Sequence, residues 1–116
     1  MAQALIIEDD FDIAEILEEM LEALEFEVDK TFSYQEAVKF VQSYEYTVII
    51  SDLNLGAMSK KGTEVMAHVK GKPLLIFISG EPHAVEETKS HVAAGAKFFP
   101  KPFNLNDIAS YIQENS

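Results

Sequence analysis

Apolar and polar residues alternate in blocks along this chain, and the blocks have two characteristic lengths. The short apolar blocks predict β-strands over residues 4–7, 26–31, 46–51, 74–78 and 97–99. Three of them, beginning at residues 4, 46 and 74, have uninterrupted apolar centres, which is typical of strands buried on both faces of a sheet. The second block alternates more regularly and therefore suits a sheet edge.

The longer blocks carry apolar residues three and four positions apart, which predicts amphipathic helices. The first helix follows from the spacing of Ile13, Ile16, Leu17, Met20, Leu21 and Leu24. Ser33 and Glu36 have the spacing of a capping box that opens the second helix. Further helices are expected over residues 63–69, over residues 82–94 and after Asn104, which can cap the last one. Regular alternation of strand and helix predicts an α/β fold with a parallel sheet covered on both faces.

Charged and hydroxyl side chains stand where the predicted strands end. Glu8 and Asp9 follow the first strand, Asp52 follows the third, Ser79 ends the fourth and Lys101 follows the fifth. Ligands of such sheets bind at the carboxyl ends of the strands. Three carboxylates that meet there repel one another unless a cation offsets their charge. Oxygen ligands favour Mg²⁺, with Mn²⁺ or Ca²⁺ as weaker candidates.

The serine and the lysine indicate what such a cation could serve. Both side chains can contact the oxygens of a phosphoryl group carried by a neighbouring carboxylate. We therefore expect an aspartyl phosphate at Asp52, with Lys101 and Ser79 contacting its oxygens. Taken singly, these residues have plainer interpretations. Glu8 and Asp9 could belong to a solvated loop, and Asp52 could cap a helix or a turn. Ser79 could belong to a turn, and Lys101 could be a surface lysine. Their occurrence together at four strand ends favours the site.

The chain resembles the receiver domains of two-component response regulators over essentially its whole length, and it is similar in plan to the single-domain chemotaxis regulators. The resemblance rests on Leu-Ile-Ile-Glu-Asp at residues 5–9, Ile-Ile-Ser-Asp-Leu at 49–53, Ile-Ser-Gly at 78–80 and Phe-Pro-Lys-Pro-Phe at 99–103. It implies a flavodoxin-like, doubly wound (βα)5 fold with strand order 2-1-3-4-5. It also implies one receiver domain over residues 1–116, without an output domain.

The resemblance assigns roles to individual residues. It implies that Asp52 is the phosphoacceptor and that Lys101 pairs with the phosphoryl group. It implies a Mg²⁺ site made by Glu8, Asp9, Asp52 and the backbone carbonyl of Asn54. The phosphoryl donor is then a histidine kinase or a histidine phosphotransfer protein, and the chain is a signalling switch that acts on a downstream protein partner, not an enzyme that turns over a substrate.

The same resemblance implies a conformational switch that couples Ser79 to Phe98, and a cis peptide bond between Lys101 and Pro102. The chain departs from the family pattern because Phe98 lacks the hydroxyl of the commoner tyrosine and the loop over residues 56–62 lacks the usual proline. These departures motivate one alternative to the switch, an adaptor that keeps the receiver fold and acts without phosphorylation. A Mg²⁺-dependent phosphatase is a further alternative, disfavoured because Asn54 stands where such enzymes usually carry an acid.

Composition excludes several other function classes. The sequence has no cysteine, which excludes disulfides, thiolate metal sites and thiol catalysis and makes the cytoplasm the expected location. No apolar run reaches the roughly 18 residues of a membrane span, so membrane insertion is not expected. The formal net charge is −11, and all nine basic residues are lysines. Nucleic-acid binding is therefore not expected.

The negative charge is concentrated at one end of the sequence. Residues 1–29 contain 11 acids and no lysine, and the remaining 9 acids are balanced by 9 lysines. In the first predicted helix, Asp12, Glu15, Glu19 and Glu22 lie opposite the apolar side. Such a face can serve solubility alone. Because the resemblance implies that this helix receives the phosphodonor, we expect the four acids to form a partner face for basic side chains.

Overall fold

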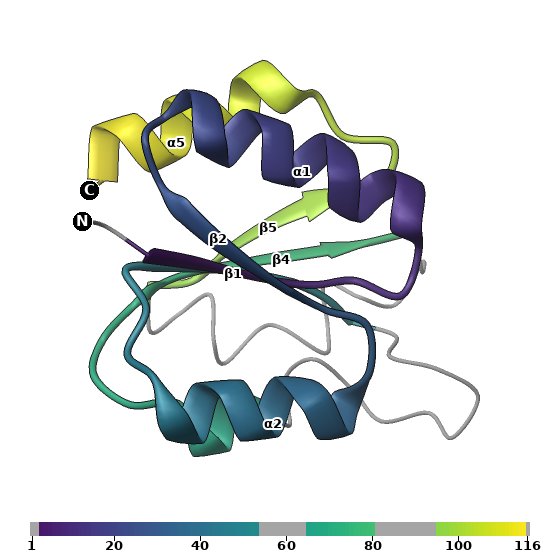
Figure 1. Cartoon of the computed structure of the whole chain (residues 1–116). Coiled ribbons are helices and arrows are strands. Elements are labelled where there is room, and N and C mark those ends of the chain that lie inside the picture. Colours follow the sequence, from purple (N-terminus) through teal and green to yellow (C-terminus); the bar gives the residue numbers. More distant parts are fainter. Residues whose placement is uncertain (1–2, 54–64, 81–94, 116) are drawn as a thin grey trace.

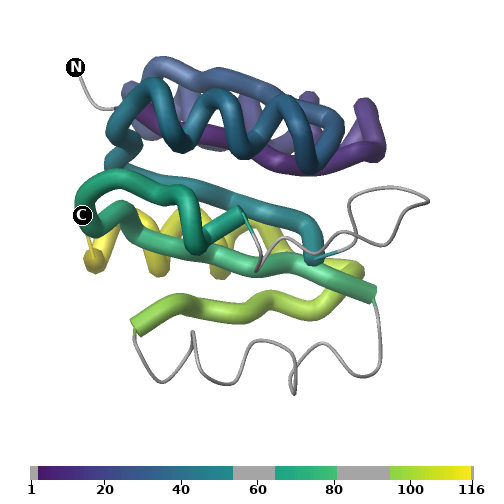
Figure 2. Tube along the Cα trace, turned by 90° about the horizontal axis from the view of Figure 1, so that it is seen from below, coloured from purple at the N-terminus to yellow at the C-terminus, as the bar shows by residue number. Residues whose placement is uncertain are grey.

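The five predicted strands form a single parallel sheet in the computed structural model, which describes residues 3–53, 65–80 and 95–115. Figures 1 and 2 show them side by side in the order β2-β1-β3-β4-β5. Their bounds are β1 (Gln3–Ile7), β2 (Glu27–Thr31), β3 (Val48–Asp52), β4 (Leu74–Ser79) and β5 (Lys97–Pro100). The predicted fold class and strand order are confirmed, and the alternating segment β2 lies at an edge.

Helices cover both faces of the sheet (Figure 1). α1 (Phe11–Ala23) and α5 (Leu105–Asn115) lie on one face, and α2 (Tyr34–Ser43) lies on the other. The described part of the segment predicted as a helix over residues 63–69 contains the 3-10 helix η1 (Met66–His68), and the helix predicted over residues 82–94 lies outside the described residues. Among the described helices, none has the length and apolar character needed to cross a membrane.

Alternate residues of the central strands supply two apolar layers, because successive side chains of a strand point to opposite faces. One layer lies between the sheet and α1 with α5, and it contains Ala4, Ile6, Val48, Ile50, Ile76 and Ile78 with Leu17, Leu21, Ile108 and Ile112. The other lies under α2 and contains Leu5, Ile7 and Ile49 with Ala37 and Val41. The uninterrupted apolar centres of β1 and β3 are thereby explained.

Local hydrogen bonds fix where each helix begins. The Asp10 carboxylate accepts from two amides of the first turn of α1 at 2.9 and 3.2 Å. At the start of α2, Ser33 Oγ accepts from the Glu36 amide at 3.3 Å, whereas Glu36 Oε1 accepts from the Phe32 amide at 3.1 Å. The predicted capping box therefore forms with its return bond shifted by one residue. The Asn104 side chain accepts from the second following amide at 2.8 Å, as expected of a cap for α5.

The strand register brings the chemically distinctive residues to one edge of the sheet. Asp52 at the end of β3 pairs with Ile78, and Ser79 at the end of β4 pairs with Pro100. The amide of Lys101 donates to the Ser79 carbonyl at 2.8 Å, which continues the ladder by one residue. Side chains that lie far apart in the sequence are thus placed at the carboxyl edge by backbone pairing alone.

A half-buried hydrogen bond joins the edge strand β2 to the segment that leads into β3. The Tyr46 hydroxyl donates to Asp29 Oδ2 at 2.7 Å, and burial together with this carboxylate raises the pKa of Tyr46. We expect Tyr46→Phe to lower the free energy of unfolding by about 1–2 kcal/mol, because the carboxylate loses its partner. Urea unfolding measures this, with the exposed Tyr44→Phe as a matched control. Equal losses in both variants would contradict it.

Candidate functional site

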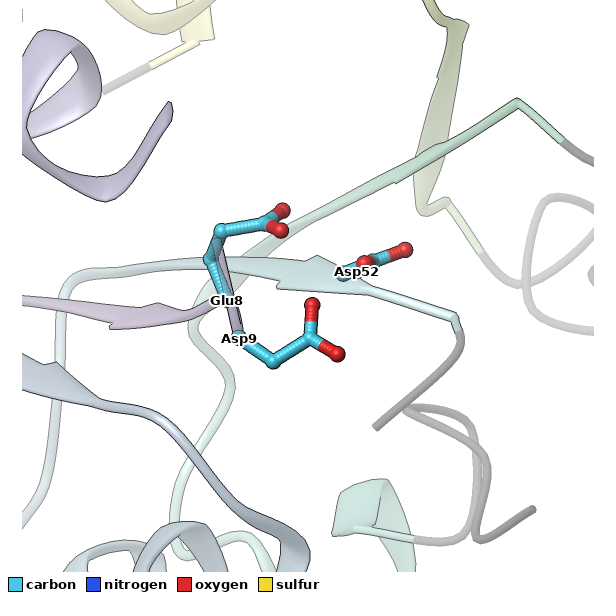
Figure 3. A group of neighbouring side chains, drawn as sticks. All are labelled: Glu8, Asp9 and Asp52. Atoms are coloured by element: carbon cyan, nitrogen blue, oxygen red, sulfur yellow. The ribbon is translucent and has the colours of Figure 1, made fainter. Parts of the chain in front are cut away.

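Three carboxylates converge at the carboxyl edge of the sheet (Figure 3). Glu8 and Asp9 follow β1, and Asp52 ends β3. One carboxylate oxygen of each residue lies within 4.8 Å of the others. Glu8 has no exposed surface and Asp52 is 6% exposed, whereas Asp9 is exposed. The site therefore has a buried floor made by two acids and an open side made by the third.

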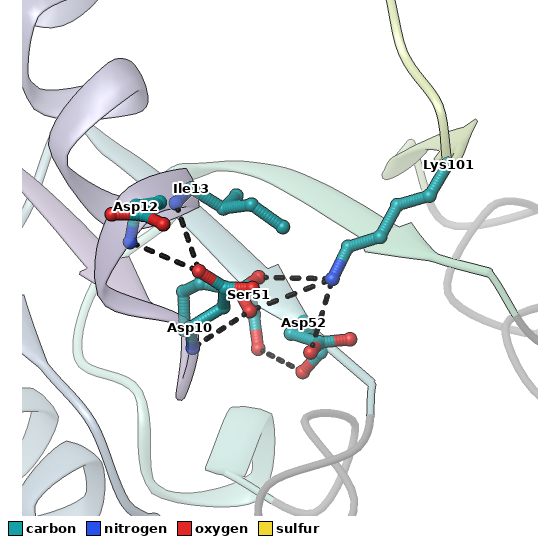
Figure 4. A network of polar contacts seen from close by, with 7 residues as sticks. Asp10, Asp12, Ile13, Ser51, Asp52 and Lys101 are labelled. Carbon is teal, nitrogen blue, oxygen red and sulfur yellow. Dashed lines mark hydrogen bonds and ion pairs between the residues drawn. The ribbon is translucent and has the colours of Figure 1, made fainter.

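The Lys101 ammonium lies between the two buried acids, with its Nζ 3.3 Å from Glu8 Oε2 and 3.4 Å from Asp52 Oδ2. Figure 4 shows the lysine side chain extending toward Asp52. The lysine follows β5 and reaches across the end of the sheet toward β1 and β3. The peptide bond between Lys101 and Pro102 is cis. One cation is thus shared by two carboxylates from different strands.

A backbone contact holds the Glu8 side chain in this position. The amide of Asp10 donates to Glu8 Oε1 at 3.2 Å, while the carboxylate of Asp10 caps α1. Sequence reasoning missed this positioning role of Asp10. The signal was its location between an acidic pair and the first residues of an amphipathic helix, where an aspartate is a preferred cap.

Burial and charge shift the ionisation of this group of side chains. Burial is the main reason that the pKa of Glu8 rises from 4.5 to about 7, and the neighbouring charge of Asp52 adds to the rise. Lys101 and the Asp10 amide oppose it. Burial alone would lower the pKa of Lys101, but the charges of Asp52 and Glu8 raise it above its ordinary value. The site holds its lysine charged while Glu8 titrates near neutral pH.

The donor set suits a hard divalent cation. All three clustered side chains offer carboxylate oxygens, and the cluster contains neither histidine nor cysteine. Oxygen ligands of this kind match Mg²⁺ and, less well, Ca²⁺ or Mn²⁺. The residues present therefore fit the predicted cation. The predicted fourth ligand, the Asn54 carbonyl, lies outside the described residues.

The two predicted switch residues lie on neighbouring strands. Ser79 is 2% exposed at the end of β4, and its carbonyl accepts from the Lys101 amide. Phe98 lies opposite Phe77 in the β4–β5 pair and packs against the cluster formed by Leu53 and Phe77. Because side chains two positions apart in a strand share a face, Ser79 and Phe77 lie on the same side of the sheet as Phe98.

The predicted partner face is solvent-exposed on α1. Asp12, Glu15, Glu19 and Glu22 are all exposed, whereas Ala14, Leu17, Met20 and Leu21 face the sheet. Glu18 is turned aside and forms an ion pair with Lys30 of β2 at 2.9 Å. Ile16 departs from the expectation that it lies on the apolar side, because 44% of its surface is exposed. The exposed strip therefore combines acids with an apolar side chain.

Comparison with known proteins agrees with this geometry. The family model for the response regulator receiver domain matches residues 4–113. The cell cycle response regulator CtrA of Brucella ovis is 30% identical over 113 residues, which are 95% of this chain and 48% of that protein. The chain thus spans about half the length of the curated relatives it matches.

Solved structures give the same result for the fold. A response regulator receiver domain (CheY-like) from Methanospirillum hungatei superposes with a TM-score of 0.84 at 24% identity, over 98% of this chain and 92% of that one. The chemotaxis response regulator CheY4 of Vibrio cholerae gives 0.79 at 26% identity, over 98% of both chains. The match of the family model over nearly the whole sequence shows that this chain belongs to the response regulator receiver domain family of two-component signalling.

Proposed function

We propose that this chain accepts a phosphoryl group on Asp52 from a phosphohistidine of a histidine kinase or a histidine phosphotransfer protein. The observation that carries the proposal is the ammonium of Lys101 shared between Asp52 and Glu8, with the Asp9 carboxylate in the same cluster. Such a cluster places positive charge beside a carboxylate that would gain negative charge on phosphorylation. Family membership supports the same chemistry.

The proposed phosphotransfer is a single displacement at phosphorus. An Asp52 carboxylate oxygen forms the new P–O bond while the P–N bond of phosphohistidine breaks. The imidazole nitrogen keeps the electron pair of the broken bond and takes up a proton from water. Lys101 Nζ, 3.4 Å from Asp52 Oδ2, then offsets the charge of the acyl phosphate, which exceeds that of the free carboxylate.

A divalent cation completes this proposal. Glu8, Asp9 and Asp52 are the side chains that would hold Mg²⁺, together with the Asn54 carbonyl. When bound, the cation supplies positive charge that stabilises the transferring phosphoryl oxygens. The chain itself supplies the orientation, since the Asp10 amide and Lys101 fix Glu8 before any phosphoryl group arrives.

Phosphorylation is proposed to change partner binding through the end of β4. Ser79 donates a hydrogen bond to a phosphoryl oxygen and is drawn toward Asp52. The Phe98 side chain, on the same face of the sheet, then changes its conformation. A downstream protein then reads the altered surface near β5 and α5. This proposal is supported by the register of β4 and β5, which pairs Ser79 with Pro100, and by the Lys101 amide, which donates to the Ser79 carbonyl.

The exposed acids of α1, which we call the acidic strip (Asp12, Glu15, Glu19 and Glu22), are proposed to receive the phosphodonor. We expect Glu15→Lys with Glu19→Lys to slow phosphotransfer from a protein donor about tenfold at low ionic strength and to weaken its salt dependence. Glu114→Lys, on the exposed surface of α5, is the matched control. Rapid-quench phosphotransfer over a salt series measures this. A wild-type rate independent of ionic strength would assign the glutamates to solubility only.

A phosphate mimic tests the switch itself. Adding Mg²⁺ with beryllofluoride should shift the amide resonances of Asp52, Ser79 and Lys101 in wild type and leave them unchanged in Asp52→Asn. No shift in wild type contradicts the proposal and favours the phosphorylation-independent adaptor. In parallel, profiling a panel of histidine kinases and phosphotransfer proteins identifies the donor that transfers fastest.

A further inference from the structure

A small pocket lies at the end of the molecule opposite the acidic cluster. Its volume is about 270 Å³, and its walls are Ala23, Leu24, Glu25, Phe26, Ile112 and Gln113. These residues come from the C-terminal ends of α1 and α5 and from the turn that follows α1, and Figure 1 shows both helices ending on the same side of the molecule. Because α1 begins beside Glu8 and its 13 residues span about 20 Å, the pocket is well separated from Asp52.

Glu25 lines this pocket in a backbone conformation that favours glycine. The turn after α1 is a Schellman motif, in which the Glu25 amide donates to the Glu22 carbonyl at 2.9 Å and the Phe26 amide donates to the Leu21 carbonyl at 3.0 Å. Glu25 has a φ of 70°, and the other described residues with positive φ are glycines. A side chain at such a position lowers stability, and strain of this kind is characteristic of functional sites.

The electrostatic environment of the pocket is negative. The C-terminal end of a helix carries partial negative charge, and two helices end here. Neither α1 nor α5 has a basic residue in its last turn. Lys97, at the start of β5, directs its ammonium over Phe99 and Tyr111 instead. Among the described residues of the pocket wall, Glu25 is the charged one, and its exposed carboxylate adds a full negative charge.

The floor of the pocket is apolar. Phe26 and Ile112 are buried and belong to the core layer beneath α1 and α5, and Leu24 packs against that layer. An apolar floor below a negative rim fits an amphipathic cation, whose alkyl stem contacts the floor while its charged head stays at the rim. The volume is below the roughly 300–1,000 Å³ of small-molecule sites, so it suits a single side chain. A guanidinium, with five donors, serves a carboxylate and nearby carbonyls better than an ammonium does.

We propose that this pocket receives an arginine side chain of a protein partner, with the guanidinium on the Glu25 carboxylate and the alkyl stem on Phe26 and Ile112. Charge complementarity selects a basic partner. A second copy of this chain cannot supply the side chain, because the sequence contains no arginine. None of the clustered carboxylates lines the pocket, so this contact needs no phosphoryl group and leaves Asp52 accessible to its donor.

The test uses N-acetyl-argininamide, which presents the side chain as a polypeptide does. At low ionic strength it should shift the amide resonances of Glu25, Phe26 and Gln113 in the full chain, with a Kd in the millimolar range. N-acetyl-citrullinamide, the neutral isostere, should bind at least tenfold more weakly. Glu25→Gln should weaken binding of the arginine probe about tenfold. Glu45→Gln, which changes an exposed glutamate outside the pocket, is the matched control and should bind like wild type.

Glu25→Gly separates binding from folding. Because glycine relieves the left-handed strain, this variant should melt about 2–4 °C above wild type and still lose the arginine probe as Glu25→Gln does. Equal binding of the two probes, or wild-type binding by Glu25→Gln, overturns the inference. Tighter binding of free arginine than of N-acetyl-argininamide assigns the pocket to the amino acid and overturns the protein partner. A Glu25→Gly variant that melts below wild type shows that Glu25 stabilises the turn and overturns its role in binding.

Discussion

The Lys101→Ala variant will lose phosphotransfer to Asp52 by about a hundredfold or more, yet it will bind Mg²⁺ more tightly than wild type. The loss follows because the lysine is the cation placed to offset the charge of the acyl phosphate, 3.4 Å from Asp52 Oδ2. The tighter binding follows because removing one positive charge leaves three carboxylates facing the cation. We expect a gain of about tenfold, from the Coulomb energy of one charge a few ångströms away.

Both quantities can be measured on one preparation. Calorimetric titration gives the Mg²⁺ affinity, at a pH well above the pKa of Glu8 so that all carboxylates are ionised, and quenched-flow assays give the rate. Lys97→Ala is the matched control, because Lys97 lies in β5, four residues before Lys101, and its ammonium lies over Phe99 and Tyr111 instead. A variant that kept the wild-type rate, or bound Mg²⁺ more weakly, would show that Lys101 does not act as assigned.

The second large effect is the pH dependence that Glu8 imposes on metal binding. Its pKa is about 7 in the metal-free fold, so the side chain carries a proton below that pH and must release it to a bound cation. We expect the Mg²⁺ affinity to fall about tenfold per pH unit below 7. Glu8→Gln should bind Mg²⁺ more weakly at high pH and lose this slope.

As pH rises, the Mg²⁺ affinity increases but the free energy of unfolding of the metal-free protein decreases. A carboxyl whose pKa is raised by folding holds its proton more firmly in the folded state, so the metal-free fold loses stability as pH rises from 4.5 to about 7. Urea unfolding without Mg²⁺ measures this slope, and Glu8→Gln should flatten it. An equal slope in wild type and variant would contradict the assignment of a raised pKa to Glu8.

Much of this fold follows from the hydrophobic pattern alone. The apolar centres of β1, β3 and β4 predicted central strands, and the alternation of β2 predicted an edge. The strand ends predicted where the chemistry lies, because parallel strands deliver their carboxyl ends to one edge. What one sequence could not supply was the contact between Glu8 and Lys101, which are 93 residues apart and meet only through the register of β1, β3, β4 and β5.

The spacing of apolar residues also did not predict which apolar side chains of α1 are exposed. Ile16 has the spacing of the buried side of α1, but the sheet and α5 do not cover the whole apolar side of that helix. Phe11 precedes the periodic residues and carried no signal. The capping box at α2 was predicted from Ser33 and Glu36, but the choice of the Phe32 amide by Glu36 depends on loop geometry that spacing does not encode.

Asp52 is proposed to accept the phosphoryl group of phosphohistidine, and a direct test is transfer from the fastest donor of the kinase panel in the presence of Mg²⁺, followed by intact-mass analysis and mapping of the modified residue. We expect one added phosphoryl group on wild type, located at Asp52 and dependent on Mg²⁺, and none on Asp52→Asn. Failure of every donor to label wild type, or equal labelling of Asp52→Asn, would contradict it.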